Sequence, residues 1–377
     1  LATLSLTSSV GPLNDVWNNF TKTIQRSNWV IAALLKKQKS TTLTAIETRS
    51  LGEAYFLRAF AHFFIAYRYG TQEQGVPFVR HEDFADQGGY DYSIPPQQAS
   101  VIDNYKMIIE DLDKAESLLP RVEEYSDADF GRPHKAACAG YKAKVYAYWA
   151  CWDKSQYANV ITEVNKMQSQ YGRDLAPDFH DNFTSDYAKW RNSEYLFAEL
   201  SEGGPHGVYG GCEFPGVSLD NGGWGVFNGW GQFKPSYDIF FEMMQDDDDV
   251  VDNTSLGEWD KHPGNYRLHQ SIFEYGDVFT YCGMQKRFYS DRDVEAGFAI
   301  AKYFEPFTYG EAEEKEDGTW EIKKDFVALG YVGDNGDWPV VRMNFPLLRF
   351  ADCLLLRAEA YLANGNATGA TADINKI

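Results

Sequence analysis

Large aromatic rings alternate with glycines and amides in one stretch of the chain, and this stretch has the clearest chemistry. It runs from Asn221 to Phe233 and reads NGGWGVFNGWGQF. Glycines let the backbone approach a ligand, indole and phenyl rings offer flat apolar faces, and amides both donate and accept hydrogen bonds. Carbohydrates match this combination, because a sugar ring has apolar faces and a hydroxylated edge. We therefore predict a carbohydrate site. The competing interpretation is that the same rings pin the loop onto the rest of the fold.

Particular residues in that stretch and in one further loop are the candidate ligand contacts. Trp224 and Trp230 are expected to stack on sugar rings, and Asn228 to hydrogen-bond with hydroxyl groups. A second loop, Asp86–Tyr92, reads DQGGYDY and again joins glycines, rings and polar groups. The other candidates are the rings and the carboxylate that supplement these contacts: Phe227, Tyr209, Tyr90, Asp91 and Tyr92.

Motifs for catalysis and metal binding are missing from the sequence. It contains no G-x-x-x-x-G-K-[ST], no G-x-S-x-G, no H-E-x-x-H, and no G-x-G-x-x-G after a predicted strand. The seven histidines show no ligand spacing on a shared helix, and 55 acidic residues make paired carboxylates uninformative. We therefore predict no catalytic residue, no metal site and no cofactor. One question stays open, which is whether the acidic run Asp246–Asp249 binds structural Ca²⁺ or is a solvated turn, since it lacks the glycine of an EF-hand loop.

The charge and hydropathy of the chain restrict its partners. Its 35 basic and 55 acidic residues give a formal net charge of −20, which repels the phosphate backbone of nucleic acids, so we predict no nucleic-acid partner. The longest apolar run, Ala59–Tyr67, is interrupted by His62 and is far shorter than the roughly 20 residues that span a bilayer. The five cysteines are widely spaced without a C-x-x-C, so we expect neither a disulfide framework nor a zinc site.

The elements that must position these loops are predicted to be helices. Apolar residues recur at intervals of three and four over five stretches, which is the period of an amphipathic helix. Gly70 is expected to end the second stretch in the left-handed conformation, and Pro120 to close the third. The last two stretches form a pair joined by a tight turn. The five predicted helices are Val16–Lys37, Thr44–Tyr69, Val101–Leu119, Lys135–Trp152 and Lys154–Tyr171.

A second helix pair is predicted at the C-terminal end, with Leu348–Asn364 followed by a helix from Ala367. Ala358, Tyr361 and Gly365 stand where a tetratricopeptide repeat has a small residue, an aromatic residue and its turn. The two pairs predict a mainly α fold built on a tetratricopeptide-like helical scaffold. Their separation is too long for a regular array, so a large insertion must divide them.

That insertion differs in composition from the predicted helices. It is rich in Gly, Pro, Trp, Tyr and Asn, with one predicted helix, Pro235–Met244, and strand-like pieces such as Ile322–Leu329. Long irregular segments inside a compact domain are usually functional, so we expect this one to carry the ligand site. The predicted organisation is a single domain over residues 1–377 with N-terminal helices, an irregular loop-rich insertion and C-terminal helices over 16–171, 172–344 and 345–377.

Four segments of the chain are similar, in order, to blocks of one known family. They begin at Glu53 (EAYFLRAF), Ile109 (IEDLDKA), Pro235 (PSYDIF) and Arg349 (RFADCLLLRAEA). The first segment is followed by the turn Val76-Pro77, as in the family. On these residues the chain resembles the SusD/RagB family of Bacteroidetes outer-membrane nutrient-binding lipoproteins.

The resemblance implies a tetratricopeptide-like scaffold with an irregular ligand-binding half, located at the cell surface and without catalysis. Such proteins sit on a SusC-like TonB-dependent transporter and capture oligosaccharide or polysaccharide for import. Family sites lie after the Val-Pro turn and before the Pro-Ser helix, which correspond here to Tyr90–Tyr92 and to about Tyr209–Trp230. A full member begins earlier, behind a lipidated cysteine, and continues past Asn375. We therefore expect this chain to be part of a longer one, with an N-terminal lipid anchor as its only link to the outer membrane.

Three other interpretations stay open at this point. Within the same family, RagB-like members imply capture of peptides instead of glycans. An α/α-toroid glycosidase would also be helical, acidic and rich in tryptophan. A cytoplasmic tetratricopeptide adaptor would be helical too, but its repeats would be contiguous and would not carry an aromatic insertion of this size.

Overall fold

The computed structural model divides into two compact units. The first comprises Leu1–Leu175, Ser193–Phe197 and Leu348–Ile377, and the second Ala176–Asn192 and Ala198–Leu347. The residues that the structure describes are 11–87, 97–183, 187–200, 235–245, 266–269, 271–274, 278–281, 284–287, 298–302, 312–314, 320–322 and 344–377.

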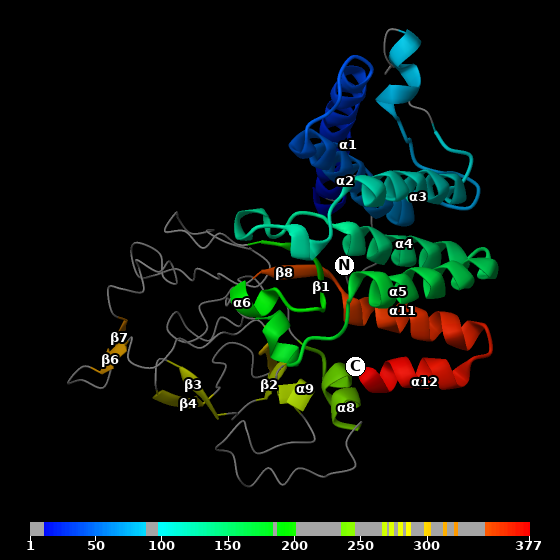
Figure 1. Ribbon diagram of the computed structural model, residues 1–377. Coiled ribbons are helices and arrows are strands. Elements are labelled where there is room, and N and C mark those ends of the chain that lie inside the picture. The colour runs from blue at the N-terminus through cyan, green and yellow to red at the C-terminus, as the bar shows by residue number, and fades with distance from the viewer. Residues whose placement is uncertain are drawn as a thin grey trace. The chain divides into compact units, whose positions relative to one another are not determined.

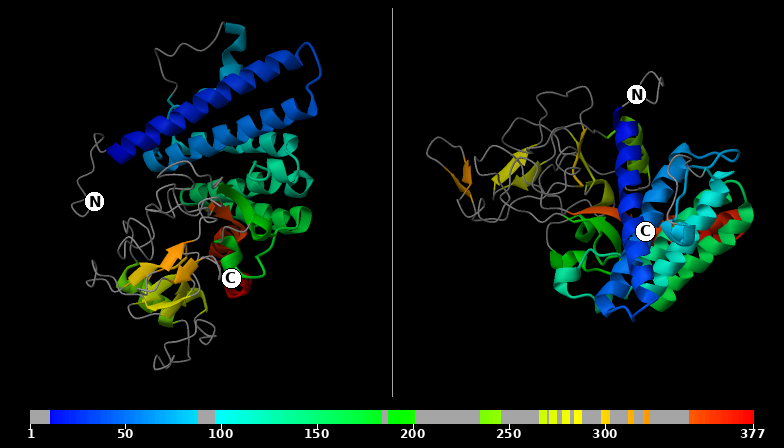
Figure 2. Two further views of the ribbon diagram at one scale, coloured as in Figure 1. Left: turned by 90° about the vertical axis from the view of Figure 1, so that its left-hand side faces the viewer. Right: turned by 90° about the horizontal axis from the view of Figure 1, so that it is seen from above.

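The first unit is a stack of helices (Figure 1). Its long helices are α1 (Gly11–Gln38), α2 (Ala45–Tyr69), α3 (Val101–Leu118), α4 (Lys135–Ala150), α5 (Tyr157–Tyr171), α11 (Phe350–Ala363) and α12 (Ala367–Lys376). Each packs against the next in this order, so that α5 lies against α11 although they are far apart in the sequence (Figure 2). Helix pairs stacked in this way are the tetratricopeptide-like arrangement. The predicted mainly α scaffold is confirmed.

Local sequence signals account for several of the helix ends. Thr44 caps α2 by accepting a hydrogen bond from the Glu47 N–H at 3.2 Å, and Glu47 bonds back to the Thr44 N–H at 2.9 Å. Ser100 caps α3, and Gly172 ends α5 with φ 61°, in the left-handed region that favours glycine. Four short 3₁₀ helices connect the long ones: η1 (His81–Gln87), η2 (Val122–Glu124), η3 (Asp127–Asp129) and η4 (Lys154–Gln156).

Small residues on α4 allow close packing in the core of the first unit. Gly140 shows this best, because a Cβ added there would lie 2.8 Å from Leu348 Cδ2 and 3.1 Å from Leu196 Cδ1. Aromatic rings of α2 fill the space between α2 and α4. Phe56 meets the edge of the Tyr141 ring with centroids 5.6 Å apart, which is a favourable geometry for aromatic pairs.

The end of α2 differs from the sequence-based prediction. Gly70 has φ −86° and ψ 149°, which is extended backbone and not the left-handed conformation expected. Glycine is required there for space instead, because an added Cβ would lie 2.7 Å from the Ala66 carbonyl oxygen and 2.9 Å from Val101 Cγ2. The close approach of α3 therefore selects glycine at this position.

The start of the first C-terminal helix also differs. Leu348 and Arg349 belong to the strand β8 (Phe345–Arg349), and α11 begins only at Phe350. Asp352 accepts a hydrogen bond from the Arg349 backbone N–H at 2.9 Å, which caps the helix directly after the strand. The helix predicted from Leu348 was therefore wrong by two residues at its start.

The second unit contains short helices and two-stranded sheets. Its described helices are η5 (Phe179–Asn182), α6 (Tyr187–Trp190), α8 (Tyr237–Gln245) and α9 (Tyr266–His269). Antiparallel pairs join β2 (Ile272–Glu274) to β5 (Phe298–Ile300), β3 (Val278–Tyr281) to β4 (Met284–Arg287), and β6 (Ala312–Glu314) to β7 (Trp320–Ile322). A further strand, β1 (Tyr195–Glu199), pairs with β8, and the chain passes between the units within each of these strands as well as after Leu175 and after Asn192.

Two of the elements predicted for the insertion have counterparts among the described residues. The helix predicted over Pro235–Met244 is α8, which begins two residues later. The strand-like piece Ile322–Leu329 overlaps β7 only at Ile322, and residues 323–329 lie outside the described part of the chain.

Candidate functional site

All eight sequence-predicted ligand contacts lie outside the residues that the structure describes. They are Trp224, Trp230, Asn228, Phe227, Tyr209, Tyr90, Asp91 and Tyr92. We call residues 88–96 the first loop and residues 201–234 the second loop, since these ranges contain all eight. The structure describes the elements on either side of each loop, and these elements determine where the loop leaves the fold.

A buried arginine fixes the element that precedes the first loop. Glu82 of η1 accepts two hydrogen bonds from Arg58 of α2, with Nη1–Oε2 at 2.9 Å and Nη2–Oε1 at 2.7 Å. Burial acts against the charge of Arg58, but its bonds to Glu82 and Asp111 outweigh burial and raise its pKa. Burial likewise acts against the charge of Glu82, and the same Arg58 bonds lower the pKa of that carboxyl. Both partners are therefore charged at neutral pH, and η1 is held to α2 by a bidentate ion pair.

A second set of bonds fixes the residues that follow the first loop. Gln97 forms an antiparallel bridge with Pro77, and its side-chain amide donates to the Gly75 carbonyl oxygen at 3.3 Å. Asn104 of α3 is fully buried and bonds both backbone groups of Val76. Its Oδ1 accepts from the Val76 N–H and its Nδ2 donates to the Val76 carbonyl oxygen, each at 2.9 Å. The Val-Pro turn and the end of the first loop are thereby anchored to α3.

The second loop is followed by α8, which packs into a small core of the second unit. Ser236 accepts from the Ile239 N–H at 3.3 Å and caps the first turn of this helix. One turn on, the Phe240 ring stacks on Phe298 with centroids 4.2 Å apart, and Leu268 and Ile272 complete the cluster. Within the second unit, the C-terminal end of the second loop is therefore anchored by apolar burial.

Metal-binding clusters and membrane-spanning helices are both absent from the described residues. No group of three or more His, Cys, Asp or Glu side chains there is arranged to bind a metal ion. The candidate calcium run, Asp246–Asp249, lies outside these residues. Within them, every helix is too short or too polar to cross a bilayer.

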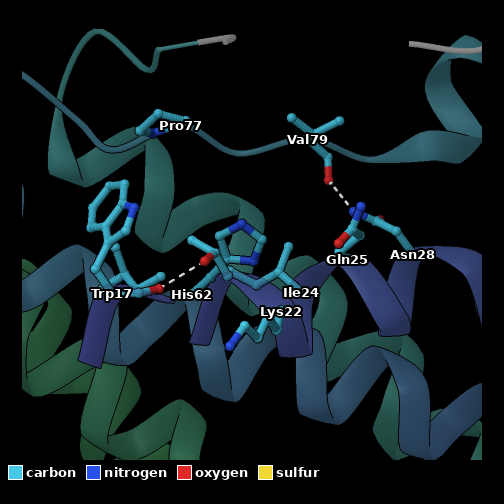
Figure 3. Close-up of a pocket in the computed structure, with 10 residues that line it drawn as sticks. Trp17, Lys22, Ile24, Gln25, Asn28, His62, Pro77 and Val79 are labelled. Atoms are coloured by element: carbon cyan, nitrogen blue, oxygen red, sulfur yellow. Dashed lines mark hydrogen bonds between the residues drawn. The ribbon is translucent and has the colours of Figure 1, made fainter. Parts of the chain in front are cut away.

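A cavity that the sequence analysis does not single out lies in the first unit between α1, α2 and the Val-Pro turn (Figure 3). Its volume is about 280 Å³. The residues that line it come from three separate segments of the chain. In the sequence, the one lining residue of unexpected type is His62, a polar residue within an apolar run. The lining residues are Trp17, Thr21, Lys22, Ile24, Gln25, Asn28, His62, Ile65, Pro77 and Val79.

Two family models match successive parts of the chain. Residues 4–147 match a SusD-like model described as starch-binding and associating with the outer membrane, and residues 175–377 match the model of the SusD family itself. The second match alone covers more than half of the chain. The chain belongs to the SusD family. The family resemblance predicted from the four sequence segments is therefore confirmed.

Relatives of this SusD family chain are distant in sequence but similar along its whole length. A SusD-like protein of Bacteroides ovatus is 24% identical over 382 residues, which cover 97% of this chain and 58% of the relative. The chain spans about 60% of the length of the curated relatives it matches.

Solved structures of SusD-like proteins share the fold. A SusD-like carbohydrate-binding protein from Bacteroides fragilis superposes with a TM-score of 0.66 at 18% identity, covering 98% of this chain and 66% of that one. A laminarin-binding SusD-like protein superposes with a TM-score of 0.63 at 18% identity, covering 96% of this chain and 69% of that one. At such identities the likeness shows the fold alone, and it agrees with the tetratricopeptide-like helix stack.

Proposed function

We propose that the chain is a cell-surface glycan-binding protein that captures oligosaccharide or polysaccharide for import through a partner SusC-like TonB-dependent transporter. Membership of the SusD family is the observation that carries this proposal. The description of one family model as starch-binding and associating with the outer membrane supports both the ligand class and the location. Solved relatives described as binding carbohydrate and laminarin support the ligand class.

The proposed mechanism is stacking of sugar rings on aromatic side chains, supplemented by hydrogen bonds to hydroxyl groups. Trp224 and Trp230 of the second loop would supply the main stacking surfaces, and Asn228 the hydrogen bonds. The remaining candidates would extend the contact, namely Phe227, Tyr209, Tyr90, Asp91 and Tyr92. Capture of this kind needs no catalytic residue and no cofactor. Affinities in the micromolar to millimolar range are expected, equivalent to about −8 to −4 kcal/mol.

Native gels that contain single polysaccharides test the proposal, with a reducing-sugar assay run on the same mixtures. Retardation by one or a few glycans without sugar release is the expected result. The variant with Trp224→Ala and Trp230→Ala should lose this retardation. The matched control is Trp152→Ala, which removes an exposed tryptophan that follows α4 in the first unit and should bind like the wild type.

Two other outcomes of the same experiment would overturn the proposal, and a third would move the site. Sugar release that a single carboxylate substitution abolishes would identify a glycosidase. Lack of retardation by every glycan, together with binding of peptides, would identify a RagB-like peptide-binding protein. Unchanged retardation of the double tryptophan variant would leave glycan capture in place but would move the site away from the second loop.

The membrane partner is tested separately, on the full-length protein with its own N-terminus. Co-expression with a SusC-like transporter, followed by purification through a tag on the transporter, should recover both proteins together. Labelling by radioactive palmitate is expected if a lipid anchors the N-terminus. Recovery of the transporter alone would contradict the proposed partnership.

A further inference from the structure

His62 is a buried polar side chain that lines the cavity between α1 and α2 (Figure 3). It is 1% exposed, and its ring stacks on Phe78 with centroids 3.5 Å apart. Nδ1 lies 3.0 Å from the Arg58 carbonyl oxygen, which only accepts hydrogen bonds, so Nδ1 carries the ring proton. Nε2 is left with a lone pair and makes no hydrogen bond to any residue that the structure describes. A ligand that donates an O–H would satisfy this acceptor.

The charge state of His62 supports the role of an acceptor. Burial, with the guanidinium of Arg58 nearby, lowers the pKa of His62 well below its ordinary value. The imidazole is therefore neutral at physiological pH, and Nε2 accepts a hydrogen bond instead of donating one.

The remaining walls of the cavity are mostly apolar, and they include one large ring. Trp17 meets the Tyr69 ring edge to face with centroids 5.2 Å apart, which fixes the position of the indole. Ile24, Ile65 and Val79 line the cavity as well. A volume of about 280 Å³ is just below the range of roughly 300–1,000 Å³ for small-molecule pockets. The cavity therefore suits a single ring and not an extended chain.

The exposed part of the lining carries one positive charge, that of Lys22. Lys22 and Gln25 of α1 are both exposed, and no described acidic side chain is within ion-pair distance of Lys22. Over Gly11–Ile31, the part of α1 that includes the lining residues, Lys22 and Arg26 are basic and Asp15 is the only acidic residue. In a chain whose net charge is −20, this is a local field that attracts an anionic group.

We propose that this cavity binds one sugar ring that carries a carboxylate or a sulfate group. The ring face would pack on Trp17, a hydroxyl group would donate to Nε2 of His62, and the anionic group would face Lys22. The inference rests on the proposed function for the class of ligand. It adds a second site, in the first unit, that is separate from the residues of the two loops.

Calorimetric titration of the full chain tests the inference with three probes: a digalacturonate, a sulfated galactan disaccharide and neutral lactose. The first two should bind to one site, and their affinity should fall as NaCl is raised. Lys22→Glu should weaken both charged probes by about tenfold, since it removes one attraction and adds one repulsion. The matched control is Lys36→Glu, which makes the same charge change at another exposed position of α1, about 21 Å further along the helix. It should change affinity by less than about twofold.

A second pair of variants tests the contact with the ring. Trp17→Ala should weaken the charged probes, whereas Trp29→Ala should not, because Trp29 is a solvent-exposed tryptophan of the same helix outside the cavity. Circular dichroism establishes that each variant is folded. If only one of the two charged probes binds, and Lys22→Glu abolishes that binding, the result supports the inference and identifies the anionic group as carboxylate or sulfate.

Several results would overturn the inference. Equal losses of affinity for the charged probes in Lys22→Glu and Lys36→Glu would show that the probes are attracted by long-range charge and not bound at a site. If triglutamate binds as tightly as digalacturonate and loses the same affinity in Lys22→Glu, the cavity recognises a carboxylate and not a sugar. Retardation of the wild type by a neutral polysaccharide, without binding of either charged probe, would overturn this inference and leave the proposed function in place. Failure of every glycan to bind would overturn both.

Discussion

Arg58 and Asp111 form a bidentate ion pair in the core of the first unit. Nε of Arg58 donates to Oδ2 of Asp111 at 2.7 Å, and Nη2 donates to Oδ1 at 2.8 Å. Both side chains are fully buried, and the pair joins α2 to α3. The same guanidinium also reaches Glu82 before the first loop and Asn28 on α1. One arginine thus connects the scaffold helices with an element that positions the candidate site.

The first prediction is that Asp111→Asn lowers the free energy of unfolding by about 3–5 kcal/mol, because it leaves a buried guanidinium with one carboxylate fewer. The control is Asp113→Asn on the same helix, whose carboxylate is 59% exposed and pairs with Lys142 at 2.8 Å. An exposed pair contributes about 0–1 kcal/mol. Urea unfolding followed by far-ultraviolet circular dichroism measures both variants, and equal losses would contradict the central role of Arg58.

The sequence predicts the helices of the first unit well because most are amphipathic and end in recognisable residues. Thr44 with Glu47, Ser100 and Gly172 each terminate an element by a local interaction. Gly70 was misassigned because its role depends on α3, a neighbour that no local pattern contains. The run Phe345–Arg349 was partly assigned to a helix because short apolar runs suit strands and helices equally.

The candidate site is predictable from the sequence only as two loops. Glycine, tryptophan and tyrosine indicate which loops could bind a sugar. The distances between their rings depend on tertiary contacts, which the sequence pattern does not reveal. Arg58, Glu82 and Asn104, which anchor the first loop, carry no sequence signal of that role. The cavity could not be predicted from the sequence either, because Trp17 and His62 line it together only when α1 packs on α2.

The second prediction is that acid destabilises the first unit through two buried histidines. Burial, with Arg173 nearby, lowers the pKa of His134 to about 3, and burial also lowers the pKa of His62 well below its ordinary value. The unfolded chain binds a proton at each imidazole near pH 6.5, whereas the folded chain does not. The free energy of unfolding therefore decreases as pH falls below about 6.5, by up to about 1.4 kcal/mol per pH unit for each histidine.

Urea unfolding at several pH values between 7 and 5 measures that slope. His134→Gln should reduce the slope by up to about 1.4 kcal/mol per pH unit, whatever its effect on stability at pH 7. His81→Gln is the control. Burial lowers the pKa of His81 too, but this imidazole is only partly buried, so its removal should change the slope less than removal of His134. A slope that stays the same in His134→Gln would show that this imidazole is protonated in the folded chain.

The third prediction is that Gly140→Ala destabilises the chain although alanine is the better helix former. Alanine gains roughly 1 kcal/mol over glycine in a helix interior. The added methyl group would overlap Leu348 and Leu196, and overpacking of a core costs about 1–3 kcal/mol. A net loss of about 1 kcal/mol is expected in thermal or urea unfolding. Gly11→Ala is the control, with no atom within 4 Å of the new group, and it should be neutral. Stabilisation of Gly140→Ala would contradict the close approach described for α4.

The fourth prediction connects the scaffold with the candidate site. Asn104→Asp replaces the amide that donates to the Val76 carbonyl oxygen by a carboxylate that only accepts, so two acceptors face each other in a buried place. A loss of about 2–3 kcal/mol in the free energy of unfolding is expected. The matched control is Asn159→Asp, an exposed amide on α5, which should change stability by less than about 0.5 kcal/mol.

Glycan affinity of the same variant, measured where it remains folded, separates two roles of Asn104. Because this side chain anchors the turn that pairs with Gln97, its loss should displace the end of the first loop. Affinity for the captured glycan should then fall severalfold if Tyr90–Tyr92 contact the ligand. Loss of stability with full affinity would mean that the first loop lies outside the site, and that the second loop alone binds the glycan.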